Sequence, residues 1–169
     1  MNWPDMTING RHYSLSHLQP FTIGVALNGE NAPTYKLYVS FGSHTFSKKW
    51  EKSDPIDHRM NHNQEERYFC TIRHDHSLHL PAIIQQGVSG KAYFSQTHNY
   101  LLVHNLPGMN APYAVFFNIE KSKSKTFDAA MFVVSAYEKP GLPKNLPKIT
   151  FNTLIAKISR GEKIFRPKK

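Results

Sequence analysis

Short runs in which apolar residues alternate with other residues recur along the chain, and this period of two is the strongest constraint on its fold. Two such runs, residues 21–27 and 35–41, flank a connection that contains Asn28-Gly29 and continues through Pro33. Successive side chains of a strand point to opposite faces, so alternation of this kind predicts strands with one buried face. The two runs therefore predict a β-hairpin whose loop is longer than two residues.

Further segments of strand character follow. Residues 91–95 and 99–106 predict a second hairpin, and residues 113–120 and 129–137 are rich in Val, Phe and Ile, with the polar segment KSKSKT between them. Residues 67–74 carry aromatic and β-branched side chains and predict one more strand. Together these runs indicate about seven strands.

Two segments have helical features instead. Residues 80–87 predict a short helix that a glycine can end. In residues 151–160 the apolar side chains recur at i, i+3, i+4 and i+7, with Thr150 placed to cap the helix and Gly161 to stop it. The predicted fold class is α+β: a mainly antiparallel sheet of about seven strands, with a short central helix and a C-terminal amphipathic helix.

The composition predicts one packed domain. With 40% hydrophobic and 20% charged residues among 169, the chain can bury a core without disulfide or metal staples. We expect a single domain over residues 1–169, with a basic tail at 161–169 and a long polar loop over 43–66 that holds one helical turn near 58–66. The single cysteine, Cys70, excludes an internal disulfide framework and is expected to be a small buried hydrophobe.

The chain lacks a start typical of a signal peptide and any run of the ~20 apolar residues that span a bilayer. We therefore expect a cytoplasmic protein with no membrane partner.

The positive charge is concentrated at the C-terminus. From Lys139 onward there are nine Lys or Arg against one acid, which gives +8 of the formal net charge of +9. Such a segment can simply keep the protein soluble, or it can attract nucleic-acid phosphate or an acidic partner protein. Lys157 and Arg160 would lie on the polar side of the last predicted helix, available to phosphate.

Ten histidines raise the question of a metal site. His58 and His62 would share one face of a helical turn, and His74 and His76 one face of a strand. Neither pair lies in an HExxH frame, and no cysteine pair accompanies them. We expect no metal and no cofactor, with most histidines at the surface or hydrogen-bonded in the core.

Two segments carry side chains suited to phosphate. On a strand over 67–74, Arg67 and Arg73 would point to one side as two guanidinium forks, unless neighbouring acids pair with them at the surface. In AAMFVVSAYEKP, Ser135 and Tyr137 would share a face with Met131 and Val133 at a strand end where the basic segment begins. Either hydroxyl can donate to a phosphate oxygen, although a tyrosine at a sheet margin is commonly structural.

This late strand, followed by a basic segment, resembles the final strand of the barnase, EndoU, colicin and RelE ribonuclease superfamily. The resemblance is close over the strand and loose over the second half of the chain. It implies a small toxin-type or phage-defence endoribonuclease that cleaves RNA without a metal. A base takes the proton of a ribose 2′-OH, the oxygen attacks the adjacent phosphate, and cationic side chains stabilise the transition state.

The resemblance assigns Ser135 and Tyr137 to the catalytic site by motif. Other candidates follow from residue type alone: His44, Arg73 and His98 as further catalytic groups, and Arg67, His74, Lys139, Lys157 and Arg160 for substrate binding. Two alternatives remain open at this point. The chain could be a non-catalytic nucleic-acid-binding module that uses its basic helix and tail, or a protein that meets an acidic partner such as a neutralising antitoxin.

Overall fold

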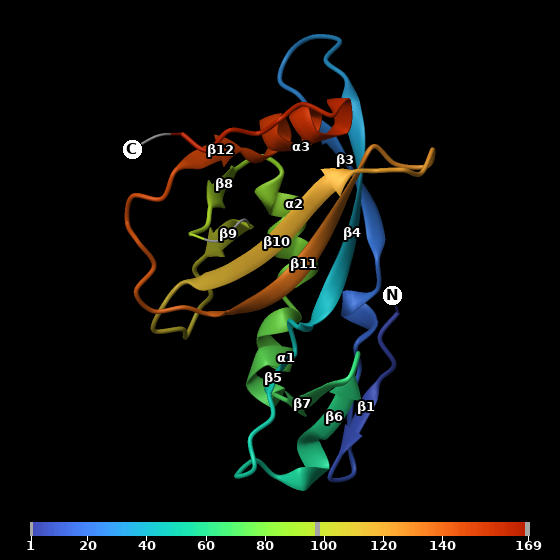
Figure 1. Cartoon of the computed structure of the whole chain (residues 1–169), viewed down its shortest axis with the longest axis vertical. Coiled ribbons are helices and arrows are strands. Elements are labelled where there is room, and N and C mark those ends of the chain that lie inside the picture. The colour runs from blue at the N-terminus through green and yellow to red at the C-terminus, as the bar shows by residue number, and fades with distance from the viewer. Residues whose placement is uncertain (1, 97–98, 168–169) are drawn as a thin grey trace.

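The fold is built on a curled seven-stranded sheet (Figure 1), seen in a computed structural model that describes residues 2–96 and 99–167. Its strands, in spatial order, are β12 (Lys148–Thr150), β8 (Lys91–Phe94), β9 (Tyr100–His104), β10 (Tyr113–Lys121), β11 (Ala129–Glu138), β4 (Thr34–His44) and β3 (Phe21–Ala26). All neighbours are antiparallel except β4 and β11, which run parallel. The predicted α+β class is confirmed, including the hairpins β3–β4 and β8–β9.

The alternating pattern places the core on one face of this sheet. Leu37, Val39 and Phe41 on β4 are fully buried, and the register pairs Val39 with Met131 and Phe41 with Val133. The neighbouring strands thus present their buried side chains to the same side, where they form one continuous apolar layer.

Two helices add their apolar sides to this layer. The central helix α2 (Leu80–Gly87) and the C-terminal helix α3 (Phe151–Arg160) both contribute buried residues to the core cluster, as predicted. α3 lies across the end of the sheet where β4 begins, and Gly161 ends it in the left-handed conformation (φ 77°). The predicted cap is wrong in one detail, because the Thr150 hydroxyl donates to the Thr153 hydroxyl and does not accept a hydrogen bond from a backbone N–H of the first turn.

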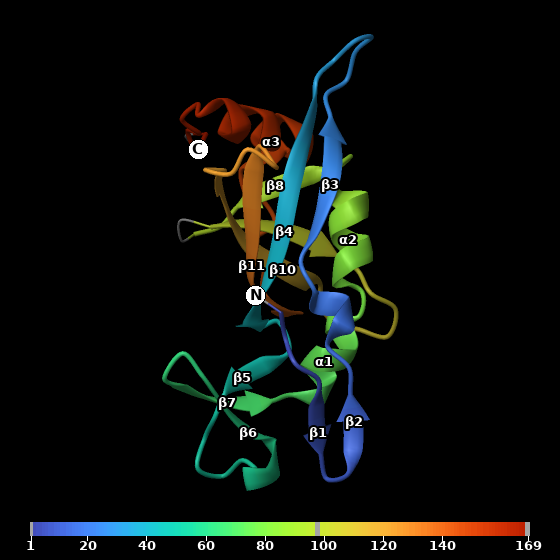
Figure 2. The ribbon, with the colours of Figure 1, turned by 90° about the vertical axis from the view of Figure 1, so that its right-hand side faces the viewer.

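A smaller assembly extends from the other end of the sheet (Figures 1 and 2). It contains β1 (Met6–Ile8), β2 (Arg11–Tyr13), the 3-10 turns η1 (Ser16–Leu18) and η2 (Ile56–His58), β5 (Ser47–Lys49), β6 (Arg59–His62), β7 (Glu65–Phe69) and the helix α1 (Thr71–Ser77). β1 pairs with β2, and β7 lies between β5 and β6. Buried aromatic side chains join this assembly to the main core, and the indole of Trp3 donates to the Phe41 carbonyl at 2.9 Å.

Two sequence predictions fail in this assembly. Residues 43–66 are not a long loop with a helical turn, since they hold β5, η2, β6 and the start of β7. Residues 67–74 are not one strand, since β7 ends at Phe69 and α1 begins at Thr71. β6 is half-exposed along its length and therefore lacks an apolar alternation. The histidine pairs predicted on a helical turn and on a strand consequently lose that geometry.

A β-bulge changes which face the end of β11 presents. The register pairs Phe117 with Val133 but Phe116 with Ser135, so Val134 is an extra residue in β11. Ser135 and Tyr137 therefore leave the buried face of Met131 and Val133 and lie on the opposite face of the sheet. The prediction that these four residues share one face is wrong, because strict alternation does not continue through a bulge.

Candidate functional site

A cleft of about 330 Å³ opens beside the C-terminal end of β11, and we call it the Tyr137 cleft. Ser135 and Tyr137 line it from β11, Phe116 lines it from β10, and Lys139 and Leu146 line it from the segment after β11. The bulge at Val134 is the reason that the serine and tyrosine face this cleft rather than the core.

Tyr137 lies among one aromatic ring and two cations. Its ring stacks on Phe116 with a centroid distance of 5.6 Å and an interplanar angle of 25°. The Arg73 guanidinium is 5.0 Å from the ring centroid, and the Lys139 ammonium is 5.9 Å from it. No acidic side chain is among the described residues that line the cleft. The cleft therefore combines an aromatic surface with uncompensated positive charge.

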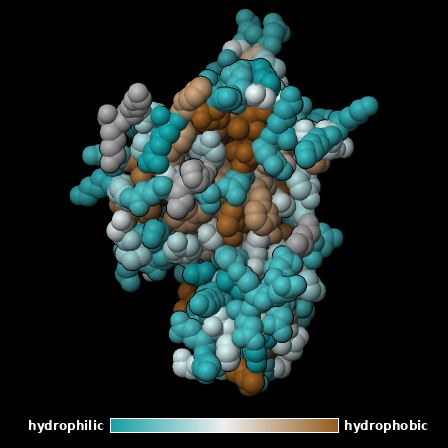
Figure 3. Space-filling view, in the orientation of Figure 1, coloured by the Kyte–Doolittle hydropathy of each residue, from teal (hydrophilic) through white to brown (hydrophobic). Residues whose placement is uncertain are grey.

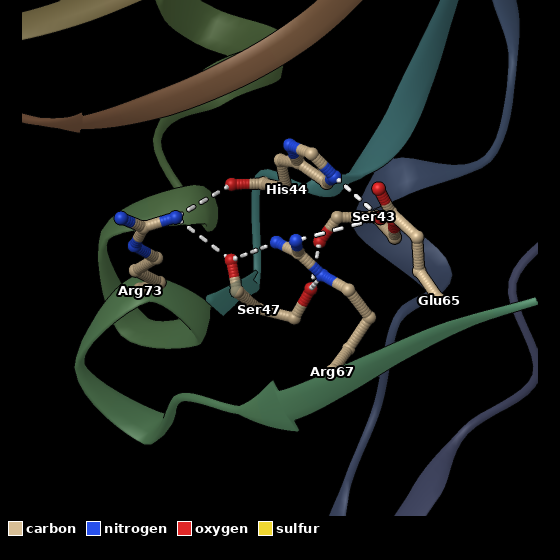
Figure 4. A network of polar contacts seen from close by, with 6 residues as sticks. All are labelled: Ser43, His44, Ser47, Glu65, Arg67 and Arg73. Carbon is tan, nitrogen blue, oxygen red and sulfur yellow. Dashed lines mark hydrogen bonds and ion pairs between the residues drawn. The ribbon is translucent and has the colours of Figure 1, made fainter. Parts of the chain in front are cut away.

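Two arginines meet at one backbone carbonyl beside this cleft (Figure 4). Arg73, on α1, donates to the Ser47 carbonyl at 2.7 Å and to the His44 carbonyl at 3.2 Å. Arg67, on β7, donates to the same Ser47 carbonyl at 3.1 Å and to its hydroxyl at 3.2 Å. The predicted pair of guanidinium groups is thus real, but it arises from a strand and a helix rather than from one strand.

The two guanidinium groups differ in exposure. Arg67 is buried, and burial lowers the pKa of its guanidinium, to which the nearby charge of Arg73 adds. The Glu65 carboxylate, 3.5 Å from Arg67, offsets part of this cost. Arg67 therefore supports the structure, whereas Arg73 is the arginine that contacts Tyr137.

His44 ends β4 next to this network. Its imidazole Nε2 lies 3.2 Å from the Glu65 carboxylate, and this hydrogen bond is the largest cause that lowers the pKa of Glu65. Figure 4 shows the ring turned toward Glu65 and away from Arg73. His44 is also the register partner of Ser135 across the parallel β4–β11 pair. A histidine oriented by a carboxylate thus lies one strand from a serine of the cleft.

Of the predicted catalytic residues, Ser135 and Tyr137 line the cleft, and Arg73 approaches the Tyr137 ring from α1. His44 lies at the neighbouring end of β4, but it lines a separate hollow together with Glu65 and Phe132. The fifth, His98, lies outside the described residues. Among the predicted substrate-binding residues, Lys139 lines the cleft together with Ser135 and Tyr137.

His74 does not reach the cleft. It is buried on α1, where its Nε2 lies 2.9 Å from the Ser14 carbonyl and its Nδ1 lies 3.1 Å from the Asp75 carboxylate. Aromatic rings of Tyr13 and Phe69 contact it on other sides. Its role is therefore that of a hydrogen-bonded core histidine.

The prediction that the helix cations gather beside Ser135 and Tyr137 is wrong. Lys157 and Arg160 pair with the Glu162 carboxylate at 3.8 and 2.5 Å, and Arg160 also donates to the Tyr35 hydroxyl. Tyr35 is near the start of β4, nine residues before its end, which corresponds to ~30 Å of strand. The cause is the direction of β11, which runs parallel to β4 and carries its last residues away from α3.

One residue of the basic tail does approach the cleft. Arg166 donates to the carbonyl of Ser95, a lining residue, at 2.7 Å. The charged tail predicted from composition thus contributes to the cleft through a single described arginine.

Sequence reasoning missed Ser47 and Phe132. Ser47 belongs to a segment that looked like loop, so no pattern identified its carbonyl as the acceptor of two arginines. Phe132 lies out of phase with its buried neighbours Met131 and Val133, and this phase was a sign that its ring is exposed.

Among residues 2–96 and 99–167, no group of three or more His, Cys, Asp or Glu side chains is arranged to hold a metal ion. No helix in these described ranges is long and apolar enough to cross a bilayer.

Comparison with known proteins places the fold in a family. The model of the YjaZ family matches residues 5–159, from just before β1 to the last turn of α3. The chain belongs to the YjaZ family. No curated protein and no solved structure matches it. The matched region of this YjaZ-family chain includes β4, α1, β10 and β11, which carry the Tyr137 cleft, and leaves out Arg166.

Proposed function

We propose that this YjaZ-family protein binds RNA, with a phosphate seated in the Tyr137 cleft. The observation that carries the proposal is that the Arg73 guanidinium and the Lys139 ammonium both lie within 6 Å of the Tyr137 ring centroid, in a cleft whose described lining residues include no acid. Guanidinium and ammonium groups bind phosphate, and the tyrosine hydroxyl and aromatic surface suit the sugar or base next to it.

The overall charge acts in the same direction. A formal net charge of +9 raises the local concentration of a polyanion and speeds its approach. Binding of this kind releases counterions from the nucleic acid, so its affinity falls steeply with salt. A small uncharged ligand would not give that dependence.

The test is fluorescence anisotropy of a labelled RNA of mixed sequence, titrated with the protein between 50 and 200 mM salt, a range over which phosphate contacts lose much of their affinity. Lys139→Glu should weaken binding by about tenfold or more and reduce the salt slope. Lys157→Glu is the matched control, because it makes the same charge change on α3. Equal weakening by both variants, or no binding by the natural protein, would overturn the proposal.

A second candidate is cleavage of the bound RNA. The favouring observation is the register of Ser135 with His44, whose ring Glu65 orients. In this scheme the imidazole takes the proton of a 2′-OH and the 2′-oxygen bonds to the adjacent phosphorus. The bond from phosphorus to the 5′-oxygen breaks, and the 5′-oxygen takes a proton from water. Arg73 and Lys139 would stabilise the added negative charge.

Cleavage is tested by incubating RNA with the protein in EDTA and analysing the ends of the products. Termini bearing 2′,3′-cyclic phosphate are expected, and His44→Gln should reduce their rate of formation by about 100-fold, the lower range for a general base. Tyr137→Phe tests the hydroxyl separately. RNA that stays intact while it binds would exclude the nuclease and leave the binding proposal standing.

A further inference from the structure

The face of the seven-stranded sheet opposite the core carries aromatic side chains beside the Tyr137 cleft. Register pairs Ser40 with Phe132 and Phe132 with Asn118, and Phe116 follows on the same face of β10. We call the surface formed by Tyr38, Ser40, Asn118 and Phe132 the open face. Figure 3 shows apolar side chains gathered in the middle of the molecule, between hydrophilic borders.

Phe132 is the most prominent side chain of the open face. It is 43% exposed and lines two hollows, of about 620 and 310 Å³. Its ring end lies over Gly42, where a Cβ would come within 2.9 Å of it. An aromatic ring of this size in a hydrated position is costly unless something covers it.

A second aromatic pair lies further along the same face. Tyr38 stacks on Phe127 with a centroid distance of 4.8 Å and an interplanar angle of 16°. Tyr38 and Phe132 both line the larger hollow. Together with the Phe116–Tyr137 stack, the face presents three aromatic positions in succession along β11.

Positive charge lies at both ends of this series. Beyond Tyr38 lie Lys36 on β4 and Lys123 and Lys125 in the connection from β10 to β11. The acids at this end are Glu120, which lines the larger hollow, and Asp128, whose carboxylate accepts the backbone amide of Lys36. These three lysines against the two acids leave a charge of +1. At the other end lie Arg73, which contacts Tyr137, and Lys139, which lines the cleft, with no acid among the described lining residues.

We infer that the open face binds a single strand of RNA, whose bases stack on Phe132 and Tyr38 while its phosphates meet the cations at the two ends. This inference rests on the proposed function and specifies the form of its ligand. Stacking requires bases that are free of a partner strand, which a duplex does not offer. From Ala130 to Tyr137 the strand advances by seven steps, or ~23 Å, enough for several nucleotides.

The charge at both ends argues against a second copy of the chain as the occupant. In a symmetric dimer each face meets the same face of its partner. Pairing of the open faces in either direction would place lysines opposite lysines or opposite the cationic cleft. A polyanion that runs the length of the face meets neither obstacle.

The experiment compares a labelled oligouridine dodecamer with a duplex of the same length by anisotropy at fixed salt. The natural protein should bind the single strand at least tenfold more tightly than the duplex. Phe132→Ala should weaken single-strand binding by about tenfold or more, since stacking on one aromatic ring accounts for that range. Phe132→Leu, which keeps apolar bulk without a π-face, should weaken single-strand binding similarly. Phe132→Trp, which keeps an aromatic ring, should bind the single strand as tightly as the natural protein does. Ile56→Ala, an exposed apolar side chain of η2, is the control and should have no effect.

The outcomes separate the two proposals. If Lys139→Glu weakens binding but Phe132→Leu and Phe132→Ala do not, the open face is excluded and the cleft proposal stands. If Phe132→Leu binds like the natural protein while Phe132→Ala does not, apolar contact rather than stacking holds the ligand, and the inference fails. A stable dimer that Phe132→Ala dissociates would also overturn it, and no nucleic-acid binding at all would overturn both proposals.

Discussion

The guanidinium of Arg73 lies 5.0 Å from the centre of the Tyr137 ring, although the two residues are 64 positions apart in the sequence. The contact joins α1 of the smaller assembly to the last residues of β11 in the main sheet. Because Arg73 also donates to the His44 and Ser47 carbonyls, it fixes the chain after β4 and places a positive charge beside the Tyr137 ring.

Replacement of Arg73 should therefore destabilise the fold as well as the site. Arg73→Ala leaves the His44 and Ser47 carbonyls without this donor, and we expect a loss of about 2–4 kcal/mol in the free energy of unfolding. Arg73→Lys keeps the positive charge but not the planar guanidinium, so the free energy of unfolding should decrease less, by about 1–2 kcal/mol. Urea unfolding measures both, with exposed Lys123→Ala as the control. Equal losses in the two arginine variants would contradict the role given to the charge.

Stability should fall in mild acid because of His17. Burial lowers the pKa of its imidazole to about 4, and the nearby His74 adds to this effect. Above pH 6.5 the ring is neutral in both the folded and the unfolded state and contributes no pH dependence to the free energy of unfolding. Between pH 6.5 and about 4 only the unfolded chain takes up the proton, so the free energy of unfolding decreases by up to about 3 kcal/mol as the pH falls.

Unfolding free energies measured by urea between pH 7 and pH 4 test this. His17→Gln should flatten the slope in that window, whereas the exposed His12→Gln should retain it. An unchanged slope in His17→Gln would mean that another group is responsible.

Gly42 is expected to tolerate no side chain. A Cβ there would lie 2.9 Å from the Phe132 ring, 3.1 Å from the Val134 carbonyl oxygen and 3.3 Å from that of Val133. The ring could move, but the backbone oxygens of the bulge could not. Gly42→Ala should therefore lower the unfolding free energy by about 1–3 kcal/mol. Gly90→Ala, where the nearest atom is 3.4 Å away, is the control for thermal unfolding of both variants.

Tyr113→Phe should leave stability unchanged or raise it. The hydroxyl is fully buried, burial raises its pKa, and it has no hydrogen-bond partner among the described residues. Removal of an unsatisfied buried hydroxyl relieves a desolvation cost of about 1–3 kcal/mol. Thermal unfolding tests this, with the half-buried Tyr93→Phe as the reference. A clear loss of stability would reveal a partner for the hydroxyl.

The main sheet could be predicted because its strands have one buried and one exposed side. The run from Leu37 to Phe41 alternates for that reason, and so does the apolar stripe of α3. The smaller assembly could not be predicted, since strands such as β6 have no buried side chain, one face being exposed and the other half-buried, and their polar residues resemble those of a loop. Phe69 and Thr71 mark a change from strand to helix that local propensity does not encode, because packing against the core determines it.

Some residues of the candidate site could be predicted from the sequence and others could not. Residue type selected Arg73 and the late-strand motif selected Tyr137, and the fold places them in contact. The prediction that Lys157 and Arg160 lie beside Tyr137 was wrong because the sequence does not reveal that β4 and β11 run parallel. That direction carries the cleft away from α3. The Ser47 carbonyl could not be selected at all, since every residue has one.

The extra residue in β11 sets the orientation of the end of the strand. A regular strand that continued the alternation of Met131 and Val133 without a bulge would turn Ala136 to water and the serine and tyrosine to the interior. Removal of Val134 itself would join Val133 to Ser135 and leave both hydroxyls on the cleft side. A homologous chain that is one residue shorter here would therefore carry the same site on a regular strand, and its alignment with this chain would need a gap at Val134.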